Sequence, residues 1–170
     1  MPLTKEIFGD APLPRIVQHA DYLDRQGTVV DDVLFTVFAG PNSYTGEDSL
    51  EISCHGNPFI AQRILEDLFG RGCRPAGPGE FTQRAFLNDK LDLAQAEAIA
   101  DLIDAGSREA VRAAMRSLQG EFSAMVRGLT EAVIDLRTYV EAAIDFPEEE
   151  IDFLADRELL ERFQAVREHL

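Results

Sequence analysis

The spacing of hydrophobic residues changes about half-way along the chain. Up to about residue 88, apolar and polar residues alternate in short runs separated by Gly and Pro, which is typical of β-strands and turns. From Leu91 onward, apolar residues recur at steps of three and four, which is typical of amphipathic helices. The sequence therefore predicts an α+β protein, with a mixed α/β domain over residues 1–88 and part of a helical domain over residues 89–170.

The first half is expected to hold a hairpin, a third strand and short helices. The turn signal at 24–27 separates the hairpin arms, and Glu51 and His55 occupy the polar face of a half-buried third strand. The buried face of the next helix is expected to include Ile64 and Leu65. The expected ranges are 3–8 for a weak helix, 15–23 and 28–38 for the hairpin, 50–54 for the third strand, 58–69 and 78–86 for helices, and 73–77 for a short strand or turn.

The second half predicts long helices. A first helix is expected to end at the break Ala105-Gly106, and Ser107 caps a second whose apolar residues repeat as far as Ile144. At 1.5 Å per residue this helix would be roughly 55–60 Å long. It would need companion helices or a second subunit to bury its apolar face. Pro147 is expected to end it, and a last helix is expected to start near Asp156.

Composition narrows the class of protein. A hydrophobic content of 45% allows a packed core, and the formal net charge of −15 argues against RNA binding by this segment alone, because RNA binding relies on basic surface. No apolar run approaches the roughly 18 residues of a membrane helix, and the N-terminus lacks a signal-peptide pattern. Two cysteines do not form a disulfide framework or a zinc cluster. We therefore expect a cytoplasmic protein that is not attached to a membrane.

The loop at residues 40–48, with the sequence GPNSYTGED, is rich in turn formers, hydroxyls and carboxylates. Such a loop between strands is most often only a turn. Its polar groups would also suit a small polar ligand. No Lys follows Gly46, so the loop does not match a nucleotide-binding phosphate loop.

Several side chains near this loop could carry chemistry, and each also has a structural interpretation. Glu51 is either a solvent-facing strand residue or an acceptor of two N–H bonds, as from an amino-pyrimidine ring. Lys90 alone would be a surface lysine. His55 and Cys54 are interpreted as structural rather than as a metal ligand or a nucleophile, and Arg84 as the partner of a nearby carboxylate. No metal site and no catalytic residue is predicted.

Three segments, 40–58, 78–105 and 139–153, closely resemble the N-terminal part of the tRNA modification GTPase family called MnmE or TrmE. They occur in the same order, and the resemblance extends over nearly the whole chain from about Arg15. The run around 44–53 is also similar to the glycine-cleavage T-protein, another tetrahydrofolate-binding family, whose fold the first domain is expected to share.

The resemblance implies a function for the first domain. In the family this domain forms a homodimer and binds a tetrahydrofolate derivative, either 5-formyl- or 5,10-methylene-tetrahydrofolate. The residue matching Glu51 contacts the pterin, and the one matching Lys90 contacts the bound folate. With an FAD-containing partner, MnmG (GidA), the family modifies the wobble uridine of certain tRNAs at C5, to the 5-carboxymethylaminomethyluridine type. GTP, Mg and K belong to a GTPase domain that has no counterpart here.

The chain departs from the family pattern, so we expect a truncated member that contacts tRNA only indirectly and is not catalytic alone. The family's first strand, with a folate-contacting Arg, and its C-terminal Cys motif have no counterpart, and Asn57 replaces a usual Gly. Two alternatives stay open. One is a folate-dependent aminomethyl transferase; the other is a non-catalytic helical oligomerisation module or gene remnant.

Overall fold

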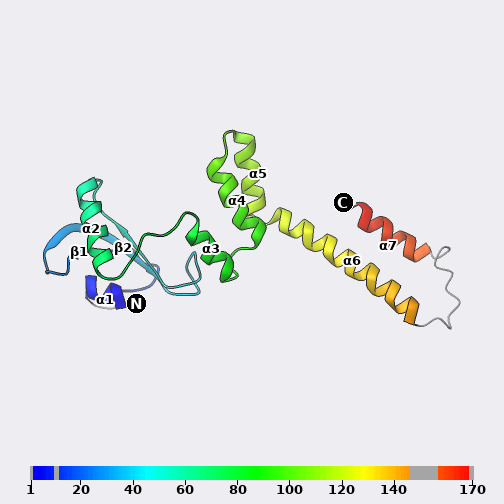
Figure 1. Cartoon of the computed structure of the whole chain (residues 1–170), viewed down its shortest axis with the longest axis horizontal. Helices are drawn as coiled ribbons and strands as arrows, with labels where there is room; N and C mark the ends of the chain where they lie inside the picture. The colour runs from blue at the N-terminus through cyan, green and yellow to red at the C-terminus, as the bar shows by residue number, and fades with distance from the viewer. Residues whose placement is uncertain (1, 10–11, 146–156, 169–170) are drawn as a thin grey trace. The chain divides into compact units, whose positions relative to one another are not determined.

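A computed structural model of the chain describes residues 2–9, 12–145 and 157–168 (Figure 1). The chain divides into two compact units, Met1–Leu91 and Asp92–Leu170. The described part is mixed α+β, as the sequence predicts, because the strands lie in the first unit and the second unit is helical. The functions assigned to the predicted domains 1–88 and 89–170 stay predictions.

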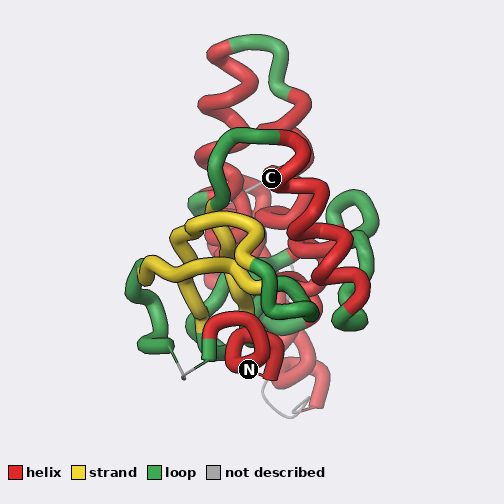
Figure 2. Tube along the Cα trace, turned by 90° about the vertical axis from the view of Figure 1, so that its left-hand side faces the viewer, coloured by secondary structure: helices red, strands yellow, loops and turns green. Residues whose placement is uncertain are grey.

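The first unit is built on a three-stranded antiparallel sheet with the order β1-β2-β3, drawn in yellow in Figure 2. Its elements are α1 (Pro2–Phe8), β1 (Gln18–Leu23), β2 (Val29–Phe38), β3 (Ser49–Ser53), α2 (Pro58–Gly70) and α3 (Glu80–Leu87). The predicted hairpin, third strand and helices are therefore confirmed, although β1 begins three residues later than expected. Residues 73–77 form no regular strand.

The core of the first unit joins α1, the sheet and α2. Ile7, Tyr22, Val33 and Ile64 are buried together, and Cys54 packs against them as the small core residue that the sequence predicts. Leu65 is 50% exposed, so its predicted burial is wrong. It follows Ile64 by about 100° around the helix axis, and the buried stripe of α2 continues through residue 67 instead.

Asp67 is a buried carboxylate that joins α2 to the hairpin. It accepts hydrogen bonds from the Tyr22 hydroxyl at 2.9 Å, the Arg25 backbone N–H at 3.0 Å and Arg71 Nε at 2.6 Å. Burial opposes its ionisation, but the Arg71 guanidinium and the other donors leave the pKa of Asp67 below its usual value. Burial, together with the hydrogen bond to Asp67, raises the pKa of Tyr22. A buried charge is stable here because its oxygens are paired.

The second unit consists of α4 (Leu93–Asp104), α5 (Arg108–Leu118), α6 (Glu121–Asp145) and α7 (Arg157–Glu168). The single long helix predicted after Ser107 is wrong, because the chain breaks between α5 and α6. Gly120 has φ +88°, a left-handed conformation that ends α5. The Leu118 carbonyl, freed from helical bonding, accepts from Gln95 Nε2 of α4 at 3.0 Å.

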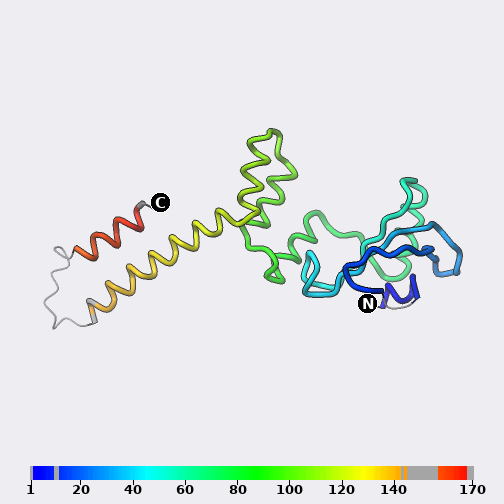
Figure 3. Tube along the Cα trace, turned by 180° about the vertical axis from the view of Figure 1, so that it is seen from behind, coloured from blue at the N-terminus to red at the C-terminus, as the bar shows by residue number. Residues whose placement is uncertain are grey.

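The helix α6 keeps much of its apolar surface exposed, including Phe122 at 53% and Ile144 at 64%. The C-terminal part of α6 packs along α7, as Figure 3 shows, through a 2.9 Å ion pair between Asp135 and Arg162. The predicted stop at Pro147 and the start near Asp156 lie outside the described residues. Within the described ranges, no helix is long and apolar enough to cross a membrane.

Candidate ligand-binding site

The loop at residues 40–48 is closed on itself by hydrogen bonds. The Gly40 N–H donates to Asp48 Oδ1 at 3.0 Å, so the two ends of the loop are joined directly. The Ser43 hydroxyl donates to the Glu47 carbonyl at 2.5 Å, and Thr45 is only 4% exposed. A loop with this much internal bonding has a defined shape rather than being a loose connection between β2 and β3.

Two glycines allow the close approaches within this loop. A Cβ at Gly40 would lie 2.7 Å from the Gly46 carbonyl oxygen, closer than real Cβ atoms come. Gly46 has φ +78°, and a Cβ there would lie 3.2 Å from both the Asn88 Cβ and the Lys90 Cγ. The loop backbone at Gly46 therefore packs directly against the side-chain stem of Lys90.

The end of α3 determines where Lys90 lies. The Lys90 N–H donates to the Ala85 carbonyl at 2.9 Å and the Asp89 N–H to the Phe86 carbonyl at 3.1 Å. These are the two bonds of a Schellman motif, and Asp89 takes the left-handed position with φ +54°. Lys90 thus closes a well-formed helix end, directly after the left-handed Asp89.

Polar side chains of this helix end contact the loop backbone. Asn88 Nδ2 donates to the Thr45 carbonyl at 2.8 Å, and Lys90 Nζ donates to the Pro41 carbonyl at 3.0 Å. These contacts join residues more than 40 positions apart in the sequence. The structure therefore brings Lys90 to the loop that the sequence analysis singled out, whereas nothing in the local sequence pattern marks Asn88 as a contact residue.

Two further contacts connect α3 itself with the loop. Arg84 Nε lies 2.7 Å from Glu47 Oε2, and the Tyr44 hydroxyl lies 3.1 Å from Thr82 Oγ1. The prediction that Arg84 pairs with a nearby carboxylate is confirmed. Arg84 Nη1 also lies 3.7 Å from Glu80, so its guanidinium joins its own helix to the loop.

Glu51 lies in β3 shortly after the loop and pairs across the sheet with Thr36. Its side chain is exposed, while the flanking Leu50 and Ile52 are partly buried, as the predicted alternation requires. In the part of the chain that the structure describes, the Glu51 carboxylate takes part in no hydrogen bond or ion pair. Both oxygens can therefore accept from a ligand.

A cavity of about 280 Å³ lies beside the loop. Leu50 and Ile52 line it, together with Thr45, Glu47 and Arg84, whereas neither Glu51 nor Lys90 does. Since Glu51 alternates with Leu50 and Ile52 along β3, its side chain points to the opposite face of the strand. The two predicted ligand-binding residues are therefore not assigned to this cavity.

His55 makes the structural contacts expected of it. Its backbone N–H donates to Asp31 Oδ2 at 2.8 Å, and its ring Nδ1 lies 2.9 Å from Asp31 Oδ1. The N–H donation lowers the pKa of Asp31. These bonds attach the chain after β3 to the start of β2.

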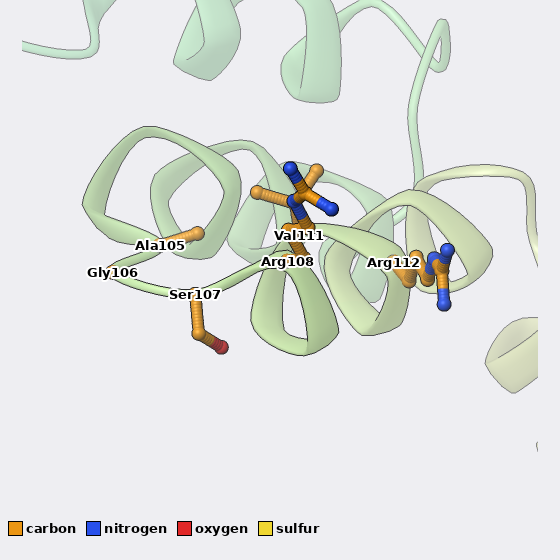
Figure 4. A pocket seen from close by; sticks show the side chains of 6 residues that line it. All are labelled: Ala105, Gly106, Ser107, Arg108, Val111 and Arg112. Atoms are coloured by element: carbon orange, nitrogen blue, oxygen red, sulfur yellow. The ribbon is translucent and has the colours of Figure 1, made fainter.

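The second unit has an open hollow of about 440 Å³ at the turn between α4 and α5, shown in Figure 4. The Ser107 hydroxyl there accepts from the Ala110 N–H at 3.1 Å and so caps α5, as the sequence predicts. In Figure 4 the Ser107 and Arg112 side chains point away from one another. The hollow does not have the converging polar groups that a ligand site needs, so the candidate site is the loop of the first unit.

Comparison with known proteins places both units in one family. Residues 2–90 match the family model described as GTP-binding protein TrmE N-terminus, and residues 93–170 match the MnmE helical domain. The chain belongs to the MnmE family. Its relatives named tRNA modification GTPase MnmE include those of Pseudomonas putida, 58% identical over 164 residues, and Opitutus terrae, 57% identical over 149 residues.

The MnmE relatives are much longer than this chain. The match covers 96% of this chain but 36% of the Pseudomonas putida protein, and 88% of this chain but 33% of the Opitutus terrae protein. The chain thus corresponds to the N-terminal and helical region of MnmE and spans about a third of the relatives' length.

Proposed function

We propose that the first unit binds a tetrahydrofolate derivative, and that it does so as the N-terminal portion of a tRNA modification GTPase that serves C5 modification of the wobble uridine. The observation that carries the proposal is the contact between Lys90 and the loop at 40–48. This lysine is exposed, but its ammonium and its stem contact a polar loop that is closed by internal hydrogen bonds. Family membership supplies the ligand class.

The two predicted residues carry groups that are chemically suited to the two ends of a folate. Lys90 has three N–H donors, and its contacts within the described part of the chain use one of them, for the Pro41 carbonyl. The other two can bind a carboxylate or a formyl oxygen. The Glu51 carboxylate can accept two N–H bonds from the amino-pyrimidine edge of a pterin. We assign no catalytic role to either residue, because both act by binding and orienting the ligand.

The partners follow from the family. We propose a homodimer through the first unit and an FAD-containing partner, MnmG (GidA), with GTP, Mg and K bound by a part of the relatives that the match does not cover. The net charge of −15 supports an indirect role toward tRNA, because an acidic surface repels phosphates.

Calorimetric titration with 5-formyltetrahydrofolate tests the proposal, with the mass in solution measured in parallel. Saturable binding by a dimer is expected. Glu51→Ala should abolish the binding while the circular dichroism of the helices is unchanged. The control is Glu66→Ala, which removes a carboxylate on the exposed side of α2. Glu47→Ala would not serve as a control, because Glu47 contacts Arg84. Unchanged affinity in the Glu51 variant would remove this residue from the site.

A non-catalytic oligomerisation module is the second candidate. The exposed apolar residues of α6 favour it, since surfaces of this kind usually pack against another helix. A chain of this class would form oligomers and ignore folate. The same titration and mass measurement therefore separate the two candidates.

A further inference from the structure

Lys90 depends on its surroundings for its position. Among the described residues, its ammonium makes one hydrogen bond, to the Pro41 carbonyl. A lysine side chain has several freely rotating bonds. The stem is restrained on one side by the Gly46 backbone. If the loop moved away from α3, Lys90 would lose both restraints together. The geometry of any site containing Lys90 is therefore set by whatever holds the loop.

Charged groups form a continuous chain from α3 to the loop. Arg74 binds both carboxylate oxygens of Glu80, at 2.7 and 2.8 Å, and the Gly77 N–H donates to Glu80 at 2.8 Å. Arg84 then lies between Glu80 and Glu47. Its guanidinium is thus anchored on α3 before it reaches the loop, which makes the contact with Glu47 a directed one.

Glu47 is the residue next to Gly46. A displacement of Glu47 moves the Gly46 backbone, and Gly46 is the loop residue that packs on the Lys90 stem. The Glu47 backbone is held from within the loop by the Ser43 hydroxyl, and its side chain is held only by Arg84 among the contacts in the described ranges. The ion pair therefore acts on Lys90 through a single intervening residue.

We propose that Arg84 and Glu47 are positioning residues for Lys90. Together with the Asn88–Thr45 and Tyr44–Thr82 contacts, their ion pair holds the loop against α3. The ammonium is thereby held in place to meet an anionic group of the ligand, such as the carboxylate tail of a folate. This role rests on the proposed function only for the identity of the ligand. The positioning of Lys90 can be measured without any ligand.

The ligand-free test uses the small number of lysines. Lys5 and Lys90 are the two lysines of the chain, so selective ¹³C labelling of lysine gives two sets of side-chain signals, with Lys5 as the internal reference. In the wild type, the two Hε protons of Lys90 should be distinct because the side chain is fixed. In Arg84→Ala and in Glu47→Ala they should merge, as in a freely rotating lysine.

Arg74→Ala is the matched control. It also removes an arginine that pairs with Glu80, but Arg74 makes no contact with the loop among those found in the described residues. Without Arg74, Arg84 keeps its own contacts with Glu80 and Glu47. The Lys90 signals should therefore stay distinct in this variant. Signals that stay distinct in Arg84→Ala, or that merge equally in Arg74→Ala, would overturn the proposal.

The affinity for 5-formyltetrahydrofolate gives the second test. Arg84→Ala and Glu47→Ala should each weaken binding by about two- to fivefold, because the ion pair is half-exposed. The double variant should lose no more than either single one, because both remove the same interaction. Arg84→Lys keeps a cation beside Glu47 and should restore most of the affinity. Additive losses in the double variant contradict the proposal. If the wild type binds no folate although Lys90 responds as expected, the folate assignment fails and the positioning role stands.

Discussion

At the scale of single residues, the loop and the helix end that faces it depend on positions that few residue types can occupy, either for lack of space or because φ is positive. Gly40 and Gly46 allow the loop to pack closely, and Asp89 occupies a left-handed position at the end of α3. Substitutions at these positions change stability through the backbone rather than through lost side-chain contacts.

Gly40→Ala should destabilise the first unit. The new Cβ would lie 2.7 Å from the Gly46 carbonyl, and a backbone atom cannot move aside as a flexible side chain can. We expect a loss of about 1–3 kcal/mol, the usual cost of overpacking. Thermal unfolding followed by circular dichroism measures it. Gly56→Ala is the control, because no atom lies within 4 Å of its added Cβ; an equal loss in both variants would contradict the explanation.

Asp89→Gly should stabilise the same unit. Asp89 has φ +54°, which costs a residue with a side chain roughly 1 kcal/mol that glycine does not incur. Part of this gain is offset by the greater freedom of glycine in the unfolded chain, so we expect about 0.5 kcal/mol in denaturant unfolding. Asp89→Ala keeps the strain and should show no gain. A gain as large with alanine would mean that the aspartate side chain, not its φ, is unfavourable.

At the scale of elements, the sequence predicts the helices and strands whose positions are determined by local patterns of residues. Alternation gave the strands, and the capping residue Ser107 gave the start of α5. The break at Gly120 was missed because the apolar repeat continues through it with correct helical spacing. The hydrogen bond from Gln95 to the Leu118 carbonyl, which accompanies this break, joins two helices. Such a contact cannot be predicted from the local sequence. The same holds for the site: Arg84 was expected to pair, but Asn88 and Thr45 meet only through the fold.

The role of Gly120 in the break between α5 and α6 can be tested by replacing two different glycines with alanine, one at the break and one inside α6. Gly120→Ala places a side chain at φ +88° and should cost about 1–2 kcal/mol. Gly128→Ala, inside α6 with no atom within 4 Å of the added Cβ, should instead stabilise by about 0.5–1 kcal/mol through helix propensity. Denaturant unfolding measures both. Stabilisation by Gly120→Ala would mean that a continuous helix is accessible.

The ion pair between Arg74 and Glu80 predicts that the stability of the first unit falls at acid pH. Hydrogen bonds from Arg74 and from the Gly77 N–H lower the pKa of Glu80 to about 2 from an ordinary value of 4.5. A lowered carboxyl pKa stabilises the folded state above pH 4.5, and this stabilisation is lost as the pH falls toward 2. Glu80→Gln should therefore be less stable than the wild type at pH 7, and the difference should shrink on acidification. A difference that does not depend on pH would exclude the ion pair as its cause.

At the scale of the whole molecule, the candidate site belongs to one unit. The loop at 40–48, Glu51 and Lys90 all lie within Met1–Leu91. A chain ending at Leu91 should fold and should bind 5-formyltetrahydrofolate as tightly as the full chain, by calorimetry. Loss of binding in a folded fragment would show that the second unit contributes to the site.

The buried Tyr22 makes the stability of the first unit depend on pH in alkaline solution. Tyr22 is 0% exposed, and its hydroxyl donates a hydrogen bond to the ionised carboxylate of Asp67. If the hydroxyl lost its proton, two negative charges would lie together inside the protein. In the unfolded chain the phenol ionises near pH 10. The folded state therefore keeps the Tyr22 proton at a pH where the unfolded chain loses it. As a result, the free energy of unfolding falls as the pH rises above about 10. The chain also contains Tyr44 and Tyr139. Once these two are replaced by phenylalanine, phenolate absorbance from Tyr22 would report the opening of the first unit without any added probe.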